Sequence, residues 1–194
     1  MFRRIVSKKN RALLAELVRT DFKLRYQGSV LGYMWTILRP LFLFAILYLV
    51  FDKFLGLGRG VPHFPVYLLM GIVIWTFFDE MTSRSLTSIV GRGSLIRKIR
   101  IPRWMIIFSS SISALINVGI NLVVLAAFMY LNEVDLRWTI LLLPLVLIQV
   151  YILALGLALF LSAVYVKFRD ISYIWEVITR AGFYATPIIY PISR

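Results

Sequence analysis

The side chains with the clearest chemical potential in this sequence are charged residues that interrupt long apolar runs. Arg39 lies inside the run at 31–51, and Glu176 and Arg180 lie four residues apart inside the run at 171–192. A cation within an apolar helix costs roughly 3 kcal/mol unless it faces water or an anion. Arg39 therefore predicts either an anion-binding position or a long side chain that reaches the lipid headgroups. Glu176 and Arg180 have the spacing of a mutual ion pair, which predicts simple neutralisation or, alternatively, a polar lining.

The residue types needed for catalysis or metal binding form no recognisable pattern. The sequence has no phosphate-binding P-loop, no H-E-x-x-H or G-x-S-x-G motif, and no pair of carboxylates at catalytic spacing. It holds one histidine, His63, and no cysteine, which excludes disulfides and a histidine-rich metal site. We therefore predict that the chain is not an enzyme, with no catalytic residue, no metal site and no cofactor bound directly.

Aromatic side chains are frequent along the apolar runs and make up 15% of the chain. Trp35, Trp104 and Trp138 stand at the ends of runs, where tryptophan typically anchors a helix at the membrane interface. Aromatic residues inside the runs either pack between helices or line a passage. The candidates for such a lining, besides Arg39, are Tyr48, Trp75, Phe78 and Tyr184.

The apolar runs themselves must form the elements that position these side chains. The chain of 194 residues is 60% hydrophobic yet has a formal net charge of +13, a combination typical of membrane spans joined by basic loops. A helix crosses the hydrocarbon core with about 20 apolar residues. The sequence predicts five such spans, at about 31–51, 64–82, 104–131, 138–166 and 171–192. The predicted fold is an all-α polytopic membrane protein, with a cytoplasmic segment at 1–30 and a transmembrane domain at 31–194.

Lysine and arginine are concentrated between alternate pairs of spans. Nine lie in the first 39 residues, six at 79–103 and three at 167–180, which together are 18 of the 22 in the chain. Because basic residues accumulate in cytoplasmic loops, we expect the N-terminus and these two loops to be cytoplasmic. The same distribution accounts for the positive charge through topology and anionic lipid, so we predict no nucleic-acid partner.

The segment from Asn10 to Tyr26 has the 3.6-residue period of an amphipathic helix. Its leucines fall on one half of the helix and its charged residues on the other. We expect this helix to lie on the membrane surface, in contact with membrane lipids, and to end near Gly28. Asp21 has Arg25 four residues later, which predicts a local ion pair.

Three long blocks of the sequence resemble the membrane subunit of ABC-2 type transporters, specifically the exporters of polysaccharide such as O-antigen, capsule or teichoic acid. The blocks are RTDFKLRYQGSVLGYMWTILRPL (19–41), FPVYLLMGIVIWTFFDEMTSRSLTSIVGRGSLIRKIRIPR (64–103) and VKFRDISYIWEVITRAGFYATPIIYPIS (166–193). They cover most of the chain in the order of the family. The family that the chain resembles has longer members with a sixth span. We therefore expect this sequence to be C-terminally truncated, with the sixth span missing.

The resemblance implies a homodimer of permease subunits joined to two separate ABC ATPase subunits, which would hold ATP and Mg, in the bacterial plasma (inner) membrane. The substrate would be a lipid-linked glycan, and Arg39 would then bind its diphosphate or an acidic sugar. Contact with the ATPase would fall on a segment at 88–101 and on the turn at 168–170. The residues assigned to coupling in this way are Arg97, Lys98, Arg100, Arg169 and Asp170. Asp170 is also a typical N-cap for the helix that follows.

Two other functions stay open on the sequence. One is an ABC-2 exporter of drugs or small lipids. The other is a membrane scaffold for glycan assembly that transports nothing itself. An ATP-binding subunit encoded beside the chain would favour transport, whereas glycosyltransferases without such a subunit would favour the scaffold.

Overall fold

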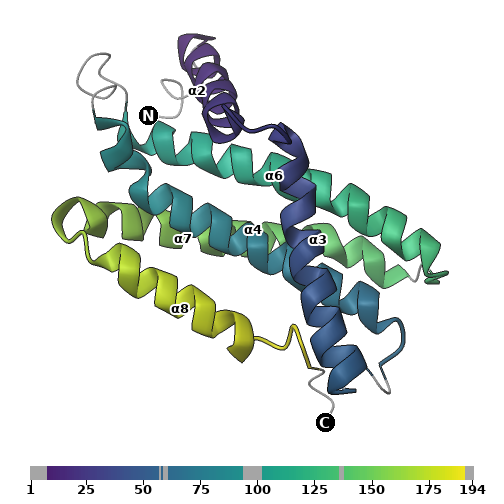
Figure 1. Cartoon of the computed structure of the whole chain (residues 1–194). Helices are drawn as coiled ribbons and strands as arrows, with labels where there is room; N and C mark the ends of the chain where they lie inside the picture. Colours follow the sequence, from purple (N-terminus) through teal and green to yellow (C-terminus); the bar gives the residue numbers. More distant parts are fainter. Residues whose placement is uncertain (1–7, 57, 59–60, 94–101, 136–137, 191–194) are drawn as a thin grey trace.

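The computed structural model describes residues 8–56, 58, 61–93, 102–135 and 138–190. This part of the chain is helical almost throughout and holds no β-strand. In chain order the elements are α2 (Lys8–Tyr26), the 3-10 turn η1 (Gly32–Met34), α3 (Trp35–Leu47), the π-helical stretch η2 (Tyr48–Phe54), α4 (Phe64–Gly91), α6 (Arg103–Leu131), the 3-10 turn η3 (Trp138–Leu142), α7 (Leu143–Lys167) and α8 (Ile171–Ala185). The predicted all-α polytopic fold is confirmed (Figure 1).

In the described part of the chain, four continuous helical segments are long and apolar enough to cross a membrane. They are Gly32–Phe54, Phe64–Gly91, Trp104–Leu131 and Ile140–Lys167. The shortest has 23 residues, which at about 1.5 Å per residue reach roughly 35 Å, against a hydrocarbon core of about 30 Å. The second of them carries the polar stretch from Asp79 onward as an unbroken continuation of its apolar part.

The structure differs from the prediction at the expected fifth span, 171–192. Helix α8 has 15 residues and reaches only about 22 Å, which is less than the hydrocarbon thickness. It stops because Thr186 precedes Pro187, and a residue before proline is pushed out of the helical region. Thr186 accordingly has extended backbone angles, φ −81° and ψ 140°.

The chain after α8 packs as a non-helical segment against the first half of α4. Ile188 and Ile189 are buried there, and Gly71 gives the room, since a Cβ at this glycine would lie 2.8 Å from Ile188. The hydroxyl of Tyr67 donates a hydrogen bond to the carbonyl of Pro187. Non-helical backbone at membrane depth needs such partners from the protein, and Tyr67 supplies one.

Helix α4 is the centre of the fold and contacts α3, α6, α7 and α8. Figure 1 shows α4, α6 and α7 running alongside one another, with α3 crossing over α4 and α6. The fully buried side chains of α4 include Leu68, Ile72, Met81 and Leu86. Charged side chains are costly to bury unless they are paired, so the charged residues that α4 carries among these helices need partners or a water-filled space.

Helix α2 packs against the start of α6, whereas the sequence predicted a helix resting on the membrane surface. Leu17 is buried and contacts Met105 and Ile106, with Leu13 beside them. The apolar face therefore rests on protein along its first part. Near the end of α2, Leu24 is 62% exposed and is available to lipid.

Candidate functional site

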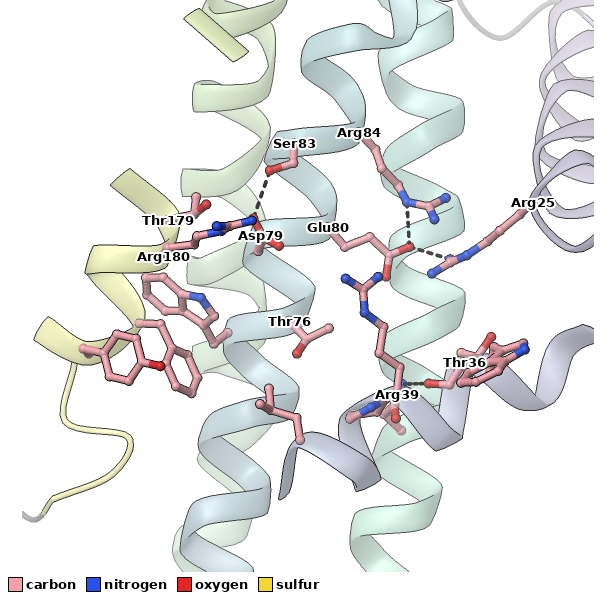
Figure 2. A pocket seen from close by; sticks show the side chains of 17 residues that line it. Arg25, Thr36, Arg39, Thr76, Asp79, Glu80, Ser83, Arg84, Thr179 and Arg180 are labelled. Atoms are coloured by element: carbon pink, nitrogen blue, oxygen red, sulfur yellow. Dashed lines mark hydrogen bonds and ion pairs between the residues drawn. The ribbon is translucent and has the colours of Figure 1, made fainter. Parts of the chain in front are cut away.

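A pocket of about 490 Å³ lies among α3, α4 and α8, with further walls from α2 and α6. Figure 2 shows side chains from these elements converging on it. Its charged lining residues are Arg25, Arg39, Asp79, Glu80, Arg84 and Arg180, and its aromatic ones are Trp35, Trp75, Phe183 and Tyr184. Four arginines face two carboxylates, so the lining carries a net charge of +2. The combination suits a ligand that is anionic in one part and offers flat faces in another.

Arg39 is positioned by the proline that follows it. Pro40 lies inside α3 and has no amide hydrogen to donate to the carbonyl four residues earlier, which belongs to Thr36. The side-chain amide of Asn121, on α6, donates to that carbonyl at 3.3 Å, and Asn121 is buried. The turn that carries Arg39 is thus fixed to α6. Arg39 itself is exposed to the pocket and makes no ion pair with another described residue.

Glu80 joins three helices through one carboxylate oxygen. Its Oε1 accepts from Arg25 Nη1 at 2.5 Å, from Arg84 Nε at 3.3 Å and from Asn117 Nδ2 at 2.5 Å. Arg25 comes from α2, Arg84 from α4 and Asn117 from α6. The side chain of Glu80 is 11% exposed and that of Arg25 is 16% exposed, so this junction is largely shielded from solvent and the charges interact strongly.

A second ion pair holds α2 one turn earlier. Asp21 pairs with Arg92, the residue directly after α4. Arg92 also donates to Ser109 Oγ at 2.9 Å. The predicted local pair between Asp21 and Arg25 is wrong, because Asp21 binds Arg92 and Arg25 binds Glu80 instead. Ion pairs between helices replace the one along the helix.

Helix α8 forms the opposite wall. Arg180 pairs with Glu176 at 2.5 Å, as the i,i+4 spacing predicted, with 76% and 53% of the two side chains exposed. Phe183 is buried against Trp75, with ring centroids 6.1 Å apart. Gly182 lets the indole approach, since a Cβ there would lie 2.8 Å from Trp75. The aromatic wall of the pocket is therefore a packed unit made from α4 and α8.

Three of the five predicted lining residues lie at the pocket, namely Arg39, Trp75 and Tyr184. Tyr48 lies elsewhere and stacks on Phe44 at 5.6 Å between centroids. Phe78 packs between Trp75 and Trp175, at 5.6 and 6.3 Å, and does not line the pocket. Trp35, predicted as an interfacial anchor, is a pocket residue.

The coupling candidates divide into two groups. Arg169 and Asp170 are exposed at the turn between α7 and α8. Arg97, Lys98 and Arg100 lie outside the described residues. Asp170 occupies the N-cap position of α8 as predicted, but its side chain makes no capping hydrogen bond; its backbone carbonyl accepts the first bonds of the helix instead.

Sequence reasoning missed Arg25, Glu80 and Asn121 as parts of this site. Glu80 offered a signal, since Asp79 and Glu80 directly follow an apolar stretch of a predicted span and intramembrane carboxylates usually have partners or a function. Within the described ranges, no three His, Cys, Asp or Glu side chains are grouped to hold a metal ion. The lining of the pocket offers arginine and aromatic side chains for binding.

Comparison with known proteins assigns the chain to a family. A sequence model of the ABC-2 type transporter family matches residues 12–194. The chain is 30% identical over 183 residues to the O-antigen export system permease protein RfbA of Myxococcus xanthus, which covers 94% of this chain and 70% of that protein. Two proteins of the same name from Klebsiella pneumoniae are 31% and 29% identical, each covering 92% of this chain and 68% of the relative. The chain is thus a multi-pass membrane protein that belongs to the ABC-2 type transporter family.

Proposed function

We propose that this chain is the membrane-spanning permease subunit of an ABC exporter that moves a lipid-linked polysaccharide across the bacterial plasma membrane. A separate ATPase subunit would supply the energy, and the N-terminus would be cytoplasmic. The names of the relatives support the class of substrate. The observation that carries the proposal is the pocket with arginine and aromatic walls between α3, α4 and α8. Sugar rings stack on aromatic faces, and arginine matches phosphate and carboxylate groups.

The proposed exporter contains two copies of the chain and two ATPase subunits. Helix α7 supports a partner or lipid on its outer side, because it exposes many large apolar residues. Those that are more than half exposed include Leu145, Ile148, Ile152, Leu153 and Phe160. An apolar surface of this extent is stable in contact with lipid or with a second subunit.

The turn between α7 and α8 is our proposed point of contact with the ATPase. Arg169 and Asp170 are exposed there, directly before α8 begins at Ile171. The same rigid helix carries Arg180 and Tyr184 to the pocket. A displacement of the turn would therefore move one wall of the pocket relative to α4.

Export can be tested with the chain and its ATPase subunit reconstituted in proteoliposomes that contain a lipid-linked glycan. We expect glycan to cross the bilayer only when ATP is supplied. ATP hydrolysis without glycan movement, under conditions where the glycan reaches the protein, would contradict the proposal.

The coupling turn can be tested by Arg169→Glu. We expect this change to leave insertion and basal ATP hydrolysis near wild type and to reduce export about tenfold or more, since charge reversal at a contact removes a favourable pair and adds repulsion. The matched control is Lys53→Glu, which makes the same reversal in η2, at the far end of the molecule (Figure 1). Export at the wild-type rate in Arg169→Glu would exclude this turn as the coupling contact.

A further inference from the structure

A groove opens on the surface of the helix bundle, between α6 and α7. Helix α4 packs along both of these helices, whereas α6 and α7 make little contact with each other, so the gap between them reaches down to α4. The groove has a volume of about 280 Å³ and shares no described lining residue with the arginine pocket. Its lining includes Ile89 of α4, Trp104 and Ile107 of α6, and Leu159, Ala163 and Val166 of α7.

The groove is apolar at its rim and at its floor. Ile107 is 3% exposed and Ser162, a further lining residue, is fully buried, whereas Leu159 and Val166 at the rim are 39% and 51% exposed. The hydroxyl of Ser162 donates to the carbonyl of Leu159 at 3.0 Å, so it needs no hydrogen bond from a ligand. The α7 wall is hollow where Ser162 and Ala163 are smaller than their neighbours. A ligand here would be held by apolar contacts.

The groove lies on helices that span the membrane. Its described lining residues all belong to the segments Phe64–Gly91, Trp104–Leu131 and Ile140–Lys167. The medium around these segments is lipid, and lipid tails are as apolar as leucine. An unfilled apolar hollow loses van der Waals contacts of its lining. A flexible hydrocarbon chain is therefore the occupant that the surroundings supply.

One end of the groove lies beside a basic side chain. Trp104 is the second residue of α6 and Val166 the second-last of α7, so the groove reaches the end of the bundle where α6 begins and α7 finishes. Lys167 follows directly, is exposed, and makes no ion pair with a described carboxylate. The indole N–H of Trp104 suits the ester and phosphate oxygens found at a membrane interface. This end of the groove favours an anionic headgroup.

We propose that the groove is a binding site for an anionic phospholipid of the surrounding membrane. Part of one acyl chain fills the hollow beside Ala163, and the headgroup phosphate pairs with Lys167. The lipid occupies space between α6 and α7 that the described side chains leave unfilled. The inference does not depend on what the chain exports, because the groove and the arginine pocket are separate.

The test uses the indole of Trp104 as a local reporter, since lipids brominated on their acyl chains quench the tryptophans that they touch. The full chain is placed in phosphatidylcholine nanodiscs with a rising fraction of brominated phosphatidylglycerol or, separately, of brominated phosphatidylcholine. The chain has five tryptophans, so the signal of Trp104 is the quenching that disappears in Trp104→Phe. A basic residue near a membrane surface favours an anionic lipid about fivefold. We expect phosphatidylglycerol to quench Trp104 at a fraction lower by this factor.

One variant tests the place of the acyl chain. Ala163→Phe puts a bulky side chain into the hollow, so we expect it to remove most of the quenching of Trp104 by both brominated lipids. The matched control is Ala127→Phe, because Ala127 is also exposed on a spanning helix but does not line the groove. It should leave the quenching of Trp104 as in the wild type.

A second variant tests the headgroup. Lys167→Gln should abolish the preference for phosphatidylglycerol, about fivefold for one charge, while quenching by phosphatidylcholine stays unchanged. Lys53→Gln is the matched control: the Lys53 side chain is 64% exposed and lies on η2, outside the groove. This control should retain the preference.

The proposal is overturned if both lipids quench Trp104 equally in the wild type, or if Ala163→Phe is quenched as strongly as the wild type. It is also overturned if neither lipid quenches Trp104, since another protein surface, such as a second copy of the chain, would then cover the groove. Because Lys167 is exposed at the end of its helix, Lys167→Gln removes no buried contact, and a preference that survives in this variant refutes the assigned headgroup contact.

Discussion

The hydrogen bond from Asn121 to the carbonyl of Thr36 makes a sharp prediction about how Pro40 is tolerated within the first span. Asn121→Leu keeps the branched shape of the side chain and removes both hydrogen bonds of the amide, to the carbonyl of Thr36 at 3.3 Å and, within α6, to that of Asn117 at 2.9 Å. A net contribution of about 0.5–1.5 kcal/mol is usual for one hydrogen bond in proteins, and bonds between membrane helices average about 0.6 kcal/mol. We therefore expect Asn121→Leu to lower the free energy of unfolding by about 1 kcal/mol.

The physical cause is tested by repeating the substitution in a Pro40→Ala background. Alanine at this position has an amide hydrogen that can bond the Thr36 carbonyl within the helix, so the donor from α6 becomes partly redundant. The cost of Asn121→Leu should then fall to a few tenths of a kcal/mol, within the range typical of non-disruptive changes. The difference between the two backgrounds is the coupling energy of the double-mutant cycle.

Unfolding by increasing mole fractions of SDS in mixed micelles, followed by circular dichroism, gives all four free energies. The control is Asn132→Leu, because the amide of Asn132 donates within its own helix, to the carbonyl of Phe128 at 2.8 Å, as that of Asn121 does to the carbonyl of Asn117. It should cost the same with and without Pro40. If Asn121→Leu is equally costly in both backgrounds, the amide does not compensate for the proline and the account of how Arg39 is positioned fails.

Two further predictions concern the wall of the pocket and the docking of α2. Gly182→Ala places a methyl group 2.8 Å from Trp75 and should displace the indole, so we expect export to fall several-fold and the tryptophan emission to shift. Gly156→Ala is the control, because a Cβ there meets nothing within 4 Å, and it should change neither export nor emission. Equal effects of the two substitutions would contradict the packing of Gly182 against Trp75. Leu17→Ala removes a buried contact with α6 and should destabilise the docking of α2 by about 2–4 kcal/mol, which hydrogen exchange would detect as faster exchange in α2. The control is Leu24→Ala, because Leu24 is 62% exposed and its truncation should cost less than about 0.5 kcal/mol. Equal protection of α2 in both leucine variants would show that the helix is held by its ion pairs alone.

The helical fold and one residue of the pocket, Arg39, could be predicted from the sequence. Apolar runs of more than 20 residues have few alternatives to spanning helices, and Arg39 stands out because a lone cation in such a run needs a reason. The end of α8 was also within reach, since Thr186 before Pro187 is a typical helix boundary. The prediction of a full fifth span gave the apolar content of 171–192 more weight than its proline.

The junction at Glu80 could not be predicted in the same way. Arg25 and Glu80 are 55 residues apart, and no periodicity or motif links them. The nearer basic neighbours of Asp21 at helical spacing favoured a pair along α2. What decides the outcome is the packing of α2 on α6 through Leu17, which turns Asp21 and Arg25 toward α4. This tertiary contact overrides a local preference of only a few tenths of a kcal/mol.

For a prediction of topology, all basic residues that flank the predicted spans count alike, but the structure shows that their contacts differ. The side chains of Arg25 and Arg92 are 16% and 18% exposed and each binds a carboxylate of another helix, whereas Arg169 is exposed at a turn. Positive charge near a span is enough to orient it, and lysine would serve as well as arginine for that purpose. A partly buried pair in which one arginine binds a carboxylate and a serine, as Arg92 does, uses the several donors of the guanidinium. Arg92→Lys should therefore preserve topology while weakening the docking of α2, which makes the two roles of the same charge separable by experiment.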